Sequence, residues 1–421
     1  MLAPLPLEAD ELSAWLRLVN ARGLKPAALC ALLRAFGLPQ HVFAQPFEAL
    51  AAAAGTEAAR AALAPPAANF AQQVAAVIAW RAQPGNALVT LADPAYPPRL
   101  LTMPDPPALL YVQGRLDLLH ARSVAVVGSR SATPQALEDA TRFARTLAAA
   151  GVTVVSGLAS GVDGAAHRGA LDERGGGGTV AVIGTGADLV YPAGHHALAA
   201  QIASRGAIVS EWPLGTPARS ANFPQRNRVI AALVEGVIVV EAAMRSGSLI
   251  TARLANEMGR DVFALPGSVH APLSRGCHRL IKEGAQLVET PEEVLEALRF
   301  TQPAPRARRT RAPRERDSTD AMTLPLEFEA QPPRVARDNA PSEPPAEAAP
   351  GRDAAHARSA ALAPEAHALL AALGHAPATL EILAQRTDMT EAALQATLLQ
   401  LELAGYVSAL PGGRFTRAPH C

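Results

Sequence analysis

Cysteine is scarce in this sequence of 421 residues, and its three copies, Cys30, Cys277 and Cys421, are far apart. An odd number of widely spaced cysteines indicates neither a disulfide framework nor a metal-binding motif. Such usage is typical of proteins in a reducing compartment. We therefore expect no structural disulfide and no zinc site.

The sequence also lacks a targeting or membrane segment. Its first residues include Glu8, Asp10 and Glu11 and no basic start, which argues against a signal peptide. No run of about 18 uncharged apolar residues indicates a transmembrane helix. Together with the cysteine usage, these absences predict a cytoplasmic protein without a membrane partner.

Lysine and net charge are lacking as well. Lys25 and Lys282 are the two lysines, so 36 of the 38 basic residues are arginine, and 38 acidic residues balance them. A chain of zero formal charge has no global field to attract a polyanion. Any anion site must therefore come from local clusters of arginine, whose planar guanidinium groups make bidentate contacts.

The motifs of common nucleotide enzymes are missing. Neither lysine stands in a G-x-x-x-x-G-K-[ST] motif, which excludes ATP hydrolysis by a P-loop. The turn GSRSAT lacks the dinucleotide fingerprint, and Gly184 and Gly186 lack its third glycine. His195 and His196 have no third metal ligand at the right spacing, and no nucleophile, base and orienting residue share a location. We predict a protein that is not an enzyme and has no cofactor.

The length predicts about two to four domains. Residues 1–82 show apolar residues three and four apart, with breaks at Gly23 and Gly37, which predicts a small helical domain. Two interpretations remain open for it: a DNA-binding module of the SAM or helix-hairpin-helix type, or a structural bundle. The small number of basic residues at its turns favours the bundle.

Residues 83–300 predict an α/β domain. Residues 85–120 are rich in proline, which disfavours helix and leaves one or two strands with loops. From Ser123 onwards, apolar strands alternate with segments of helical spacing; the strands are SVAVVG, VTVVSG, TVAVIG, AIVSE, GVIVVEAA and DVFALPG. Near-continuous Val and Ile runs in this alternation are typical of a Rossmann-like, mainly parallel sheet with right-handed crossovers.

The last part of the chain changes composition twice. Residues 301–360 are rich in Pro, Ala and Glu, with six arginines between 306 and 316, which predicts a disordered linker. That basic run is either a solvated tether or a loose DNA contact.

Residues 361–421 predict three helices and a hairpin with a Pro-Gly-Gly turn, the pattern of a winged-helix domain. From residue 361 onwards the chain contains three basic and five acidic residues, so strong binding to duplex DNA is not expected.

The strand ends of the central domain carry the candidate site, because ligands of open parallel sheets bind beyond the carboxyl ends of the strands. Glycines and hydroxyls follow nearly every strand, and small residues let backbone N–H groups approach phosphate oxygens. Cations lie in or just beyond the same loops: Arg130, Arg226, Arg228, Arg245, Arg275, Arg279 and Lys282. The sequence therefore predicts an anion-binding crevice along one edge of the sheet.

Three features favour single-stranded DNA as the ligand. Ser246, Gly247 and Ser248 stand where a helix should begin, and its unpaired amides can bind a phosphate. Arg130 can add a bidentate contact to phosphate. Phe223 can stack on a base, and single strands leave their base faces free.

Several of these residues also have a structural interpretation. Small residues such as Gly128 and Ser129 are needed in any Rossmann-like first turn. Arg226 and Arg228 could brace their loop by pairing with Glu211 or Glu241 instead of binding DNA. Separately, Asp163 could cap the helix that it begins, and His167 is better explained by packing than by ligand binding.

Taken together, six ordered motifs resemble the DNA-processing protein DprA (Smf) family: VAVVGSR, VVSGLASGVDGAAH, TVAVIGTGADLVYP, SEWPLG, the segment from NFPQRNR to DVFALPG, and LIKEGA. The resemblance covers about residues 88–290. It implies a protein that binds and protects single-stranded DNA and loads the RecA recombinase during natural transformation and homologous recombination. It implies no catalysis, no cofactor, and a homodimer formed through the Rossmann-like domain.

The resemblance also implies a DNA-binding set. Arg130 and the loop residues Phe223, Arg226, Asn227 and Arg228 match the family motifs most directly. The full expected set is Gly128, Ser129, Arg130, Ser156, Gly157, Phe223, Arg226, Asn227, Arg228, Ser246, Gly247, Ser248 and Lys282. Some relatives carry lysine where this chain has Ser220, beside Arg219.

Two other functions remain open on the sequence. The first is a nucleotide-processing enzyme of a lysine-decarboxylase-like Rossmann family, although the P-G-G-x-G-T-x-x-E motif of such enzymes is absent. The second is a winged-helix regulator with a ligand-binding core, which the absence of Lys and Arg from the recognition helix argues against.

Overall fold

The structure is a computed structural model that describes residues 4, 6–173, 175–300, 363–373, 378–387, 389–410 and 413–418. The predicted linker at 301–360 lies outside the described residues.

Six helices form the amino-terminal region: α1 Ala9–Val19, α2 Pro26–Phe36, α3 Pro39–Phe43, α4 Phe47–Ala54, α5 Thr56–Leu63 and α6 Phe70–Arg81. Proline begins α2 and α3, where its missing N–H costs nothing and its fixed φ suits the first turn. Gly37 ends α2 with a φ of 80°, which side chains other than glycine rarely adopt. The predicted helical region is confirmed.

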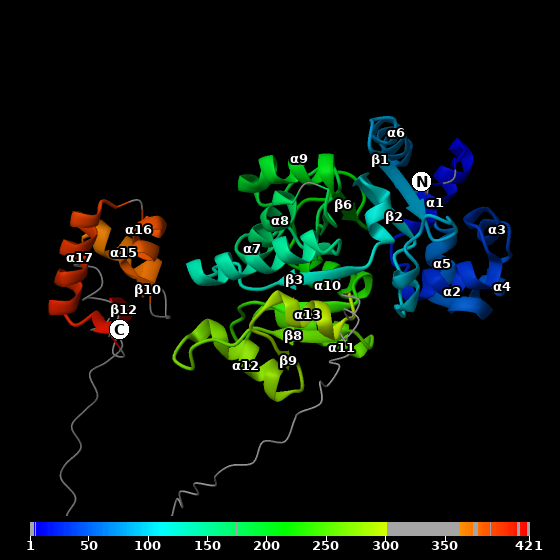
Figure 1. Ribbon diagram of the computed structural model, residues 1–421. Helices are drawn as coiled ribbons and strands as arrows, with labels where there is room; N and C mark the ends of the chain where they lie inside the picture. Colours follow the sequence, from blue (N-terminus) through cyan, green and yellow to red (C-terminus); the bar gives the residue numbers. More distant parts are fainter. Residues whose placement is uncertain are drawn as a thin grey trace, which may run out of the picture. The chain divides into compact units, whose positions relative to one another are not determined.

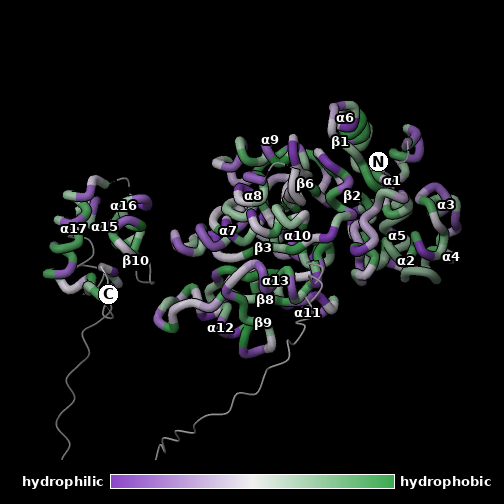
Figure 2. The backbone as a smooth tube through the Cα atoms, viewed as in Figure 1, coloured by the Kyte–Doolittle hydropathy of each residue, from purple (hydrophilic) through white to green (hydrophobic). Residues whose placement is uncertain are grey.

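These helices share one core with the first two strands of the sheet. Trp15 and Leu12 are buried together with Leu88 and Leu109 from the strands. The ring centroids of Trp80 and Tyr111 lie 5.7 Å apart in an edge-on arrangement. Figure 1 shows the helices gathered beside β1 and β2, and Figure 2 shows many hydrophobic positions along them.

A sheet of nine strands follows: β1 Asn86–Thr90, β2 Leu109–Gly114, β3 Ser123–Val127, β4 Thr153–Ser156, β5 Thr179–Val182, β6 Ala207–Ser210, β7 Gly236–Val239, β8 Asp261–Ala264 and β9 Gln286–Leu287. Their spatial order is β1-β2-β6-β5-β4-β3-β7-β8-β9. The pairs β1–β2 and β2–β6 are antiparallel and all other pairs are parallel, so the predicted mainly parallel α/β sheet is confirmed. The chain leaves β3 towards β4 and later returns to β7 on its other side, which creates a topological switch point beside β3.

Helices cover both faces of the sheet: α7 Pro134–Ala149, α8 Val162–Asp172, α9 His196–Arg205, α10 Asn222–Leu233, α11 Gly247–Glu257, α12 Arg275–Lys282 and α13 Pro291–Ala297. Short 3₁₀ turns lie at η1 Pro98–Thr102, η2 Leu116–Leu119, η3 Ala193–His195 and η4 Pro272–Ser274. Successive residues of β3 point to opposite faces. Val124 and Val126 belong to the core with Phe143 of α7, whereas Ala125 and Val127 belong to the core of α10 and α11. Burial on both faces explains why the strands are continuously apolar.

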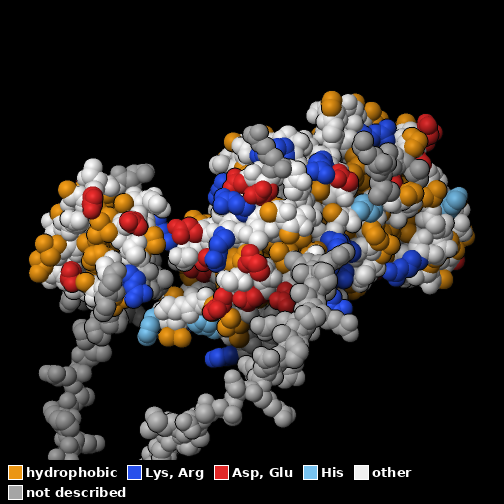
Figure 3. Space-filling view, viewed as in Figure 1, with side chains coloured by type: hydrophobic (Ala, Val, Ile, Leu, Met, Phe, Trp, Pro, Cys, Tyr) orange, Lys and Arg blue, Asp and Glu red, His pale blue; other side chains and the backbone are white. Residues whose placement is uncertain are grey.

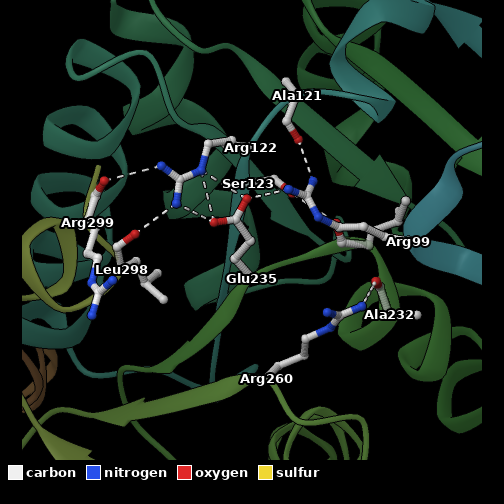
Figure 4. A network of polar contacts seen from close by, with 10 residues as sticks. Arg99, Ala121, Arg122, Ser123, Ala232, Glu235, Arg260, Leu298 and Arg299 are labelled. Carbon is white, nitrogen blue, oxygen red and sulfur yellow. Dashed lines mark hydrogen bonds and ion pairs between the residues drawn. The ribbon is translucent and has the colours of Figure 1, made fainter. Parts of the chain in front are cut away.

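A polar network joins distant segments at the amino ends of β3 and β7 (Figure 4). Arg99 and Arg122 approach the Glu235 carboxylate from two sides, and Arg122 Nη2 lies 2.6 Å from its Oε2. Arg122 Nη2 also donates to the carbonyl of Leu298, at 2.8 Å. Through this one carboxylate, the network joins the proline-rich segment 85–120, the sheet and the segment after α13.

The carboxyl-terminal part is built from α15 Pro364–Leu373, α16 Leu380–Thr387 and α17 Glu391–Leu403, with strands β10 Ala378–Thr379, β11 Val407–Leu410 and β12 Arg414–Arg417. Thr390 caps α17 by accepting a hydrogen bond from the Ala393 amide at 3.4 Å. Leu394, Leu398 and Leu401 form the buried stripe of α17. The predicted winged-helix domain is confirmed; the two-residue strand β10 was not predicted.

None of the described helices combines the length and the hydrophobicity that crossing a bilayer requires.

Replacement of Glu235 by alanine is expected to lower the free energy of unfolding by about 1–3 kcal/mol, because two arginines lose their charged acceptor. Urea unfolding followed by circular dichroism measures the change. The matched control is Glu257→Ala, whose exposed pair with Arg253 contributes within about 0.5 kcal/mol. Equal midpoints for the two variants would contradict a structural role of the network.

Candidate nucleic-acid interface

Two adjoining hollows lie beyond the carboxyl ends of β3, β4, β5 and β7, at the switch point of the sheet. The serine hollow has a volume of about 400 Å³ and is lined by Gly128, Ser129, Arg130, Ser131, Asn227, Arg245, Ser246, Gly247 and Ser248, among others. The aromatic hollow is smaller, about 50 Å³, and is lined by Arg130, Gly157, Ala159, Ser160, Ile183, Gly184, Thr185, Tyr191, Pro192 and Phe223. Arg130 and Ala159 line both, so the two hollows form one crevice.

Arg130 stands at the junction of the two hollows. Its side chain is exposed, and its guanidinium carbon lies 4.9 Å from the centroid of the Phe223 ring. This cation–π contact orients the guanidinium without neutralising it. Over the described part of the chain, no carboxylate forms an ion pair with Arg130, so its charge stays available to an anion.

Phe223 and Tyr191 form one wall of the aromatic hollow. Their ring centroids lie 5.5 Å apart with planes inclined by 41°, and Tyr191 is 46% exposed. A Cβ atom at Gly184 would lie 3.2 Å from the Phe223 ring, so the glycine lets the ring lie against the end of β5. Tyr191 was not predicted as a site residue. It lies in the loop after β5, although the loops after other parallel strands did supply predicted site residues.

The amino end of α11 faces the serine hollow. Ser246 precedes the helix, and its Oγ accepts from the Ser248 amide at 3.4 Å and lies 2.7 Å from Ser248 Oγ. Asn227 Nδ2 donates to the carbonyl of Gly247 at 3.2 Å, which ties α10 to this turn. The first amides of α11 and its dipole together form an anion-binding end. The structure brings these four predicted residues together with Arg130.

Gly128 and Ser129 form the turn after β3. A Cβ atom at Gly128 would lie 2.6 Å from Val162 Cγ2, so this position is tightly packed. Ser129 is buried, and its Oγ accepts from the Ser131 amide at 3.2 Å. Both residues line the serine hollow, but Ser129 mainly holds the turn that positions Arg130.

Arg226 contributes to the floor of the serine hollow and is almost wholly buried. Its side chain is 3% exposed, and Nη1 donates to the carbonyls of Gly157, at 2.5 Å, and Val182. It pairs with neither Glu211 nor Glu241. Burial lowers the pKa of Arg226 to about 10, with the nearby Asp163 opposing the shift, so the group stays protonated at neutral pH. A direct contact between Arg226 and DNA stays a prediction; in the structure its Nη1 is engaged by the two carbonyls.

Asp163 and Ser156 are also structural in this arrangement. Asp163 Oδ2 accepts from the amides of Gly157, at 3.1 Å, and Ala159, at 3.3 Å. It therefore organises the loop after β4 and does not cap α8, where Gly161 occupies the N-cap position. Burial raises the pKa of Asp163, while Arg226 and the two amides oppose the shift. The fully buried Ser156 donates from Oγ to the carbonyl of Val126, at 2.7 Å, and joins β4 to β3.

Arg228 braces the loop, which was one of the two predicted alternatives. It forms an ion pair with Glu211, and its Nη1 donates to the carbonyl of Asp105 at 2.6 Å. Its side chain is 15% exposed. Burial raises the pKa of Glu211 to about 7, against the effect of Arg228. Glu241 accepts instead from the amide and hydroxyl of Thr133, each at 3.0 Å, at the start of α7.

Lys282 does not belong to the crevice. A helix between two parallel strands runs back to the edge where the strands begin. Lys282 is the last residue of α12, and the following Glu283 and Gly284 line a different hollow with Asp261, the first residue of β8. Arg279 also lies late in α12 and pairs with Glu283 at 2.7 Å. Arg130, Arg219, Arg245 and Arg275 are the exposed arginines at or near the strand ends.

His167 is a core residue, as the packing interpretation predicted. Its Nε2 accepts from the Leu158 amide at 3.3 Å, so Nδ1 carries the proton and donates to Thr179 Oγ1 at 2.8 Å. Burial lowers the pKa of His167 to about 3, so the ring is neutral at physiological pH. No group of three metal-ligating side chains occurs among the residues that the structure describes.

Charge on the surface is mixed. On the face in Figure 3, basic and acidic side chains lie intermixed over the described residues. This agrees with a formal net charge of zero. In a chain without net charge, the charge of Arg130 at the crevice is therefore a local feature.

The chain is similar to known proteins over most of its length. Residues 87–299 match the family described as DNA recombination-mediator protein A, and residues 341–413 match the DprA winged helix domain. Protein Smf of Escherichia coli (strain K12) is 40% identical over 350 residues, which cover 82% of this chain and 81% of that protein. DNA processing protein DprA of Streptococcus pneumoniae is 47% identical over 211 residues, covering 50% of this chain and 74% of that protein.

A solved structure agrees with the sequence comparisons. The X-ray structure of DNA processing protein A from Streptococcus pneumoniae superposes with a TM-score of 0.57 and 37% identity. The match covers 66% of this chain and 95% of that chain.

Replacing Arg226 by alanine should lower the free energy of unfolding by about 3 kcal/mol, because two buried carbonyls lose their donor and Asp163 loses its nearby cation. Arg226→Lys should recover only part of this, since an ammonium cannot reproduce the planar fork. Chemical denaturation measures both. The exposed Arg219→Ala is the control and is expected to change stability by less than about 0.5 kcal/mol. A fully stable Arg226→Ala protein would show that the buried guanidinium does not hold the strand ends.

Proposed function

Because the chain belongs to the DprA/Smf family of DNA recombination-mediator proteins, we propose that its crevice binds single-stranded DNA. The observation that carries the proposal is the unpaired Arg130 resting on Phe223 at the junction of the two hollows. A guanidinium and an aromatic face placed together suit a ligand that alternates phosphates and bases.

The two hollows offer different chemistry to such a strand. The wall of Phe223 and Tyr191 presents ring faces on which bases can stack, and stacking requires bases that are not paired in a duplex. The amino end of α11, with Ser246, Gly247 and Ser248, presents N–H and hydroxyl donors to a phosphate. Arg130 lies between them and can reach either group.

Buried residues support the crevice without touching DNA in this proposal. Arg226 and Asp163 hold the ends of β4 and β5, and Arg228 is occupied by Glu211 and Asp105. Their substitution would weaken binding through the shape of the crevice. Asn227 and Gly247 would position the α11 amides, and Gly157 lines the aromatic hollow.

We propose that the crevice binds DNA without catalysing a reaction. The buried ionisable groups nearest the crevice, Asp163, His167 and Glu241, are each engaged by backbone or hydroxyl groups. In the proposal these three side chains hold the loops of the crevice and do not act on a substrate. We therefore propose a binding protein that needs no cofactor.

Beyond DNA binding, we propose that the chain acts in the cytoplasm as a recombination mediator. It would protect single-stranded DNA and load a RecA recombinase during natural transformation or another recombination task. It would act as a homodimer formed through the Rossmann-like domain. Family membership supports these steps, and the domain limits of residues 1–82, 83–300, 301–360 and 361–421 are part of the same proposal.

Arg130→Ala and Phe223→Ala should each weaken binding of an oligothymidylate by about 5- to 150-fold, which corresponds to losing about 1–3 kcal/mol of phosphate or stacking contact. Fluorescence anisotropy over a salt series measures this. Loss of one phosphate contact should also reduce the salt slope of Arg130→Ala by about 0.7. Arg145→Ala, which breaks an exposed ion pair between α7 and Asp172 of α8, is the control. Equal affinity of Arg130→Ala and wild type would remove the crevice from the binding site.

Wild-type protein should speed the assembly of RecA on single-stranded DNA that is coated with single-strand-binding protein. Arg130→Ala should do so several-fold less well, because the mediator must first hold the strand. DNA-dependent ATP hydrolysis by RecA reports the assembly, and Arg145→Ala serves again as the control. Identical RecA kinetics with and without the wild-type chain would contradict a loading role while leaving DNA binding untouched.

A further inference from the structure

A second groove lies outside the crevice, on the amino-terminal helices. It has a volume of about 790 Å³ and lies between the end of α1, the connection from α5 to α6, and Pro213 from the loop after β6. Its polar and aromatic lining comprises Arg17, Asn20, Arg22, Asn69, Phe70 and Gln73. The groove is not part of the crevice described above.

The charges of this groove are of one sign. Arg17 and Arg22 line it, and none of its lining residues is acidic. Within the part of the chain that the structure describes, neither arginine has an ion pair, and Arg17 Nε is buried without a hydrogen bond. The Arg17 guanidinium carbon lies 4.2 Å from the centroid of the Phe43 ring, which orients the group while leaving its charge unneutralised. In a chain of zero net charge, two unpaired cations make a local site for an anion.

The remaining lining suits bases rather than a simple anion. Alanines and prolines between Ala61 and Ala68 give an apolar surface, and the half-buried Phe70 adds an aromatic ring. The side-chain amides of Asn20, Asn69 and Gln73 are without hydrogen-bond partners in the described residues. Amides can pair with the exposed edges of unpaired bases, and rings can stack on their faces.

A second hollow adjoins the groove and extends it towards the crevice. A hollow of about 270 Å³ shares Asn20, Gln73 and Pro213 with it and extends to Asp188 and Gly215. The Asp188 carboxylate accepts from the Gly215 amide at 2.9 and 3.0 Å, so a backbone donor already engages its charge.

The loop after β5 contributes to both this hollow and the crevice. Asp188 lines the hollow, and Thr185, three residues earlier, lines the aromatic hollow. Three residues span at most about 11 Å, so the hollow lies within a short distance of the crevice.

We propose that this groove is a second subsite for single-stranded DNA, occupied by the same strand that enters the crevice. Arg17 and Arg22 bind its phosphates, and Phe70 with the apolar surface receives its bases. The inference rests on the proposed function of the crevice and extends it to the amino-terminal helices. It selects the DNA-binding interpretation of residues 1–82 over the purely structural one.

The test compares two probe lengths, because a short strand fills the crevice and a long one reaches the groove. Oligothymidylates of about 6 and about 20 nucleotides are measured against wild type, Arg22→Glu and the double variant Arg17→Ala/Arg22→Ala. The groove variants should bind the long probe about 10-fold more weakly and the short probe within about 2-fold of wild type. The double variant should lower the salt slope for the long probe by about 1.4.

Matched variants separate the possible failures. Arg34→Ala removes an exposed arginine of α2 that does not line the groove, and it should leave both probes unaffected. Arg22 is exposed, so Arg22→Glu keeps the test valid if the Arg17 variant unfolds. If the groove variants bind both probes like wild type, or lose both equally, the second subsite is wrong. If Arg130→Ala binds both probes like wild type, the crevice itself is wrong, and the two failures are thereby distinguished.

Discussion

One buried guanidinium holds the candidate site together. Arg226 donates to the carbonyls of Gly157 and Val182, where β4 and β5 end and their ladders no longer provide partners. Buried carbonyls without donors are costly, so this side chain stabilises the edge of the sheet as well as its shape. Asp163 completes the arrangement by accepting from the amides of the same loop. The solvent-facing hollows therefore depend on the guanidinium of Arg226, which is itself buried.

The arginines of this site divide into two kinds. Arg226 and Arg228 sit among carbonyls and carboxylates and belong to the framework. Arg130 rests only on an aromatic ring and keeps its charge for a ligand. Since arginine supplies nearly all positive charge in this chain, residue type cannot distinguish the two roles. Burial and partners distinguish them.

The fold could be predicted because parallel strands buried on both faces must be apolar throughout, and segments such as SVAVVG are recognisable alone. The site could be predicted only in part. Nearness to a strand end identified Arg130, Phe223 and the turn before α11. It could not show that Arg226 turns inward, because that depends on which carbonyls are left unpaired in three dimensions. The position predicted for Lys282 differs from the structure for a related reason. Lys282 follows a strand end in the sequence, but the full helix α12 carries it back to the opposite edge of the sheet.

The pairing of Arg130 with the Phe223–Tyr191 wall has a consequence for selectivity. Ring faces and backbone donors respond to what all nucleotides have in common, a flat π surface and a charged diester. The hydroxyl of Thr185, which lines the aromatic hollow, is already engaged with the carbonyl of Leu189 at 2.7 Å. A wall of this kind does not distinguish one base from another, so the proposed site would bind single strands irrespective of their sequence.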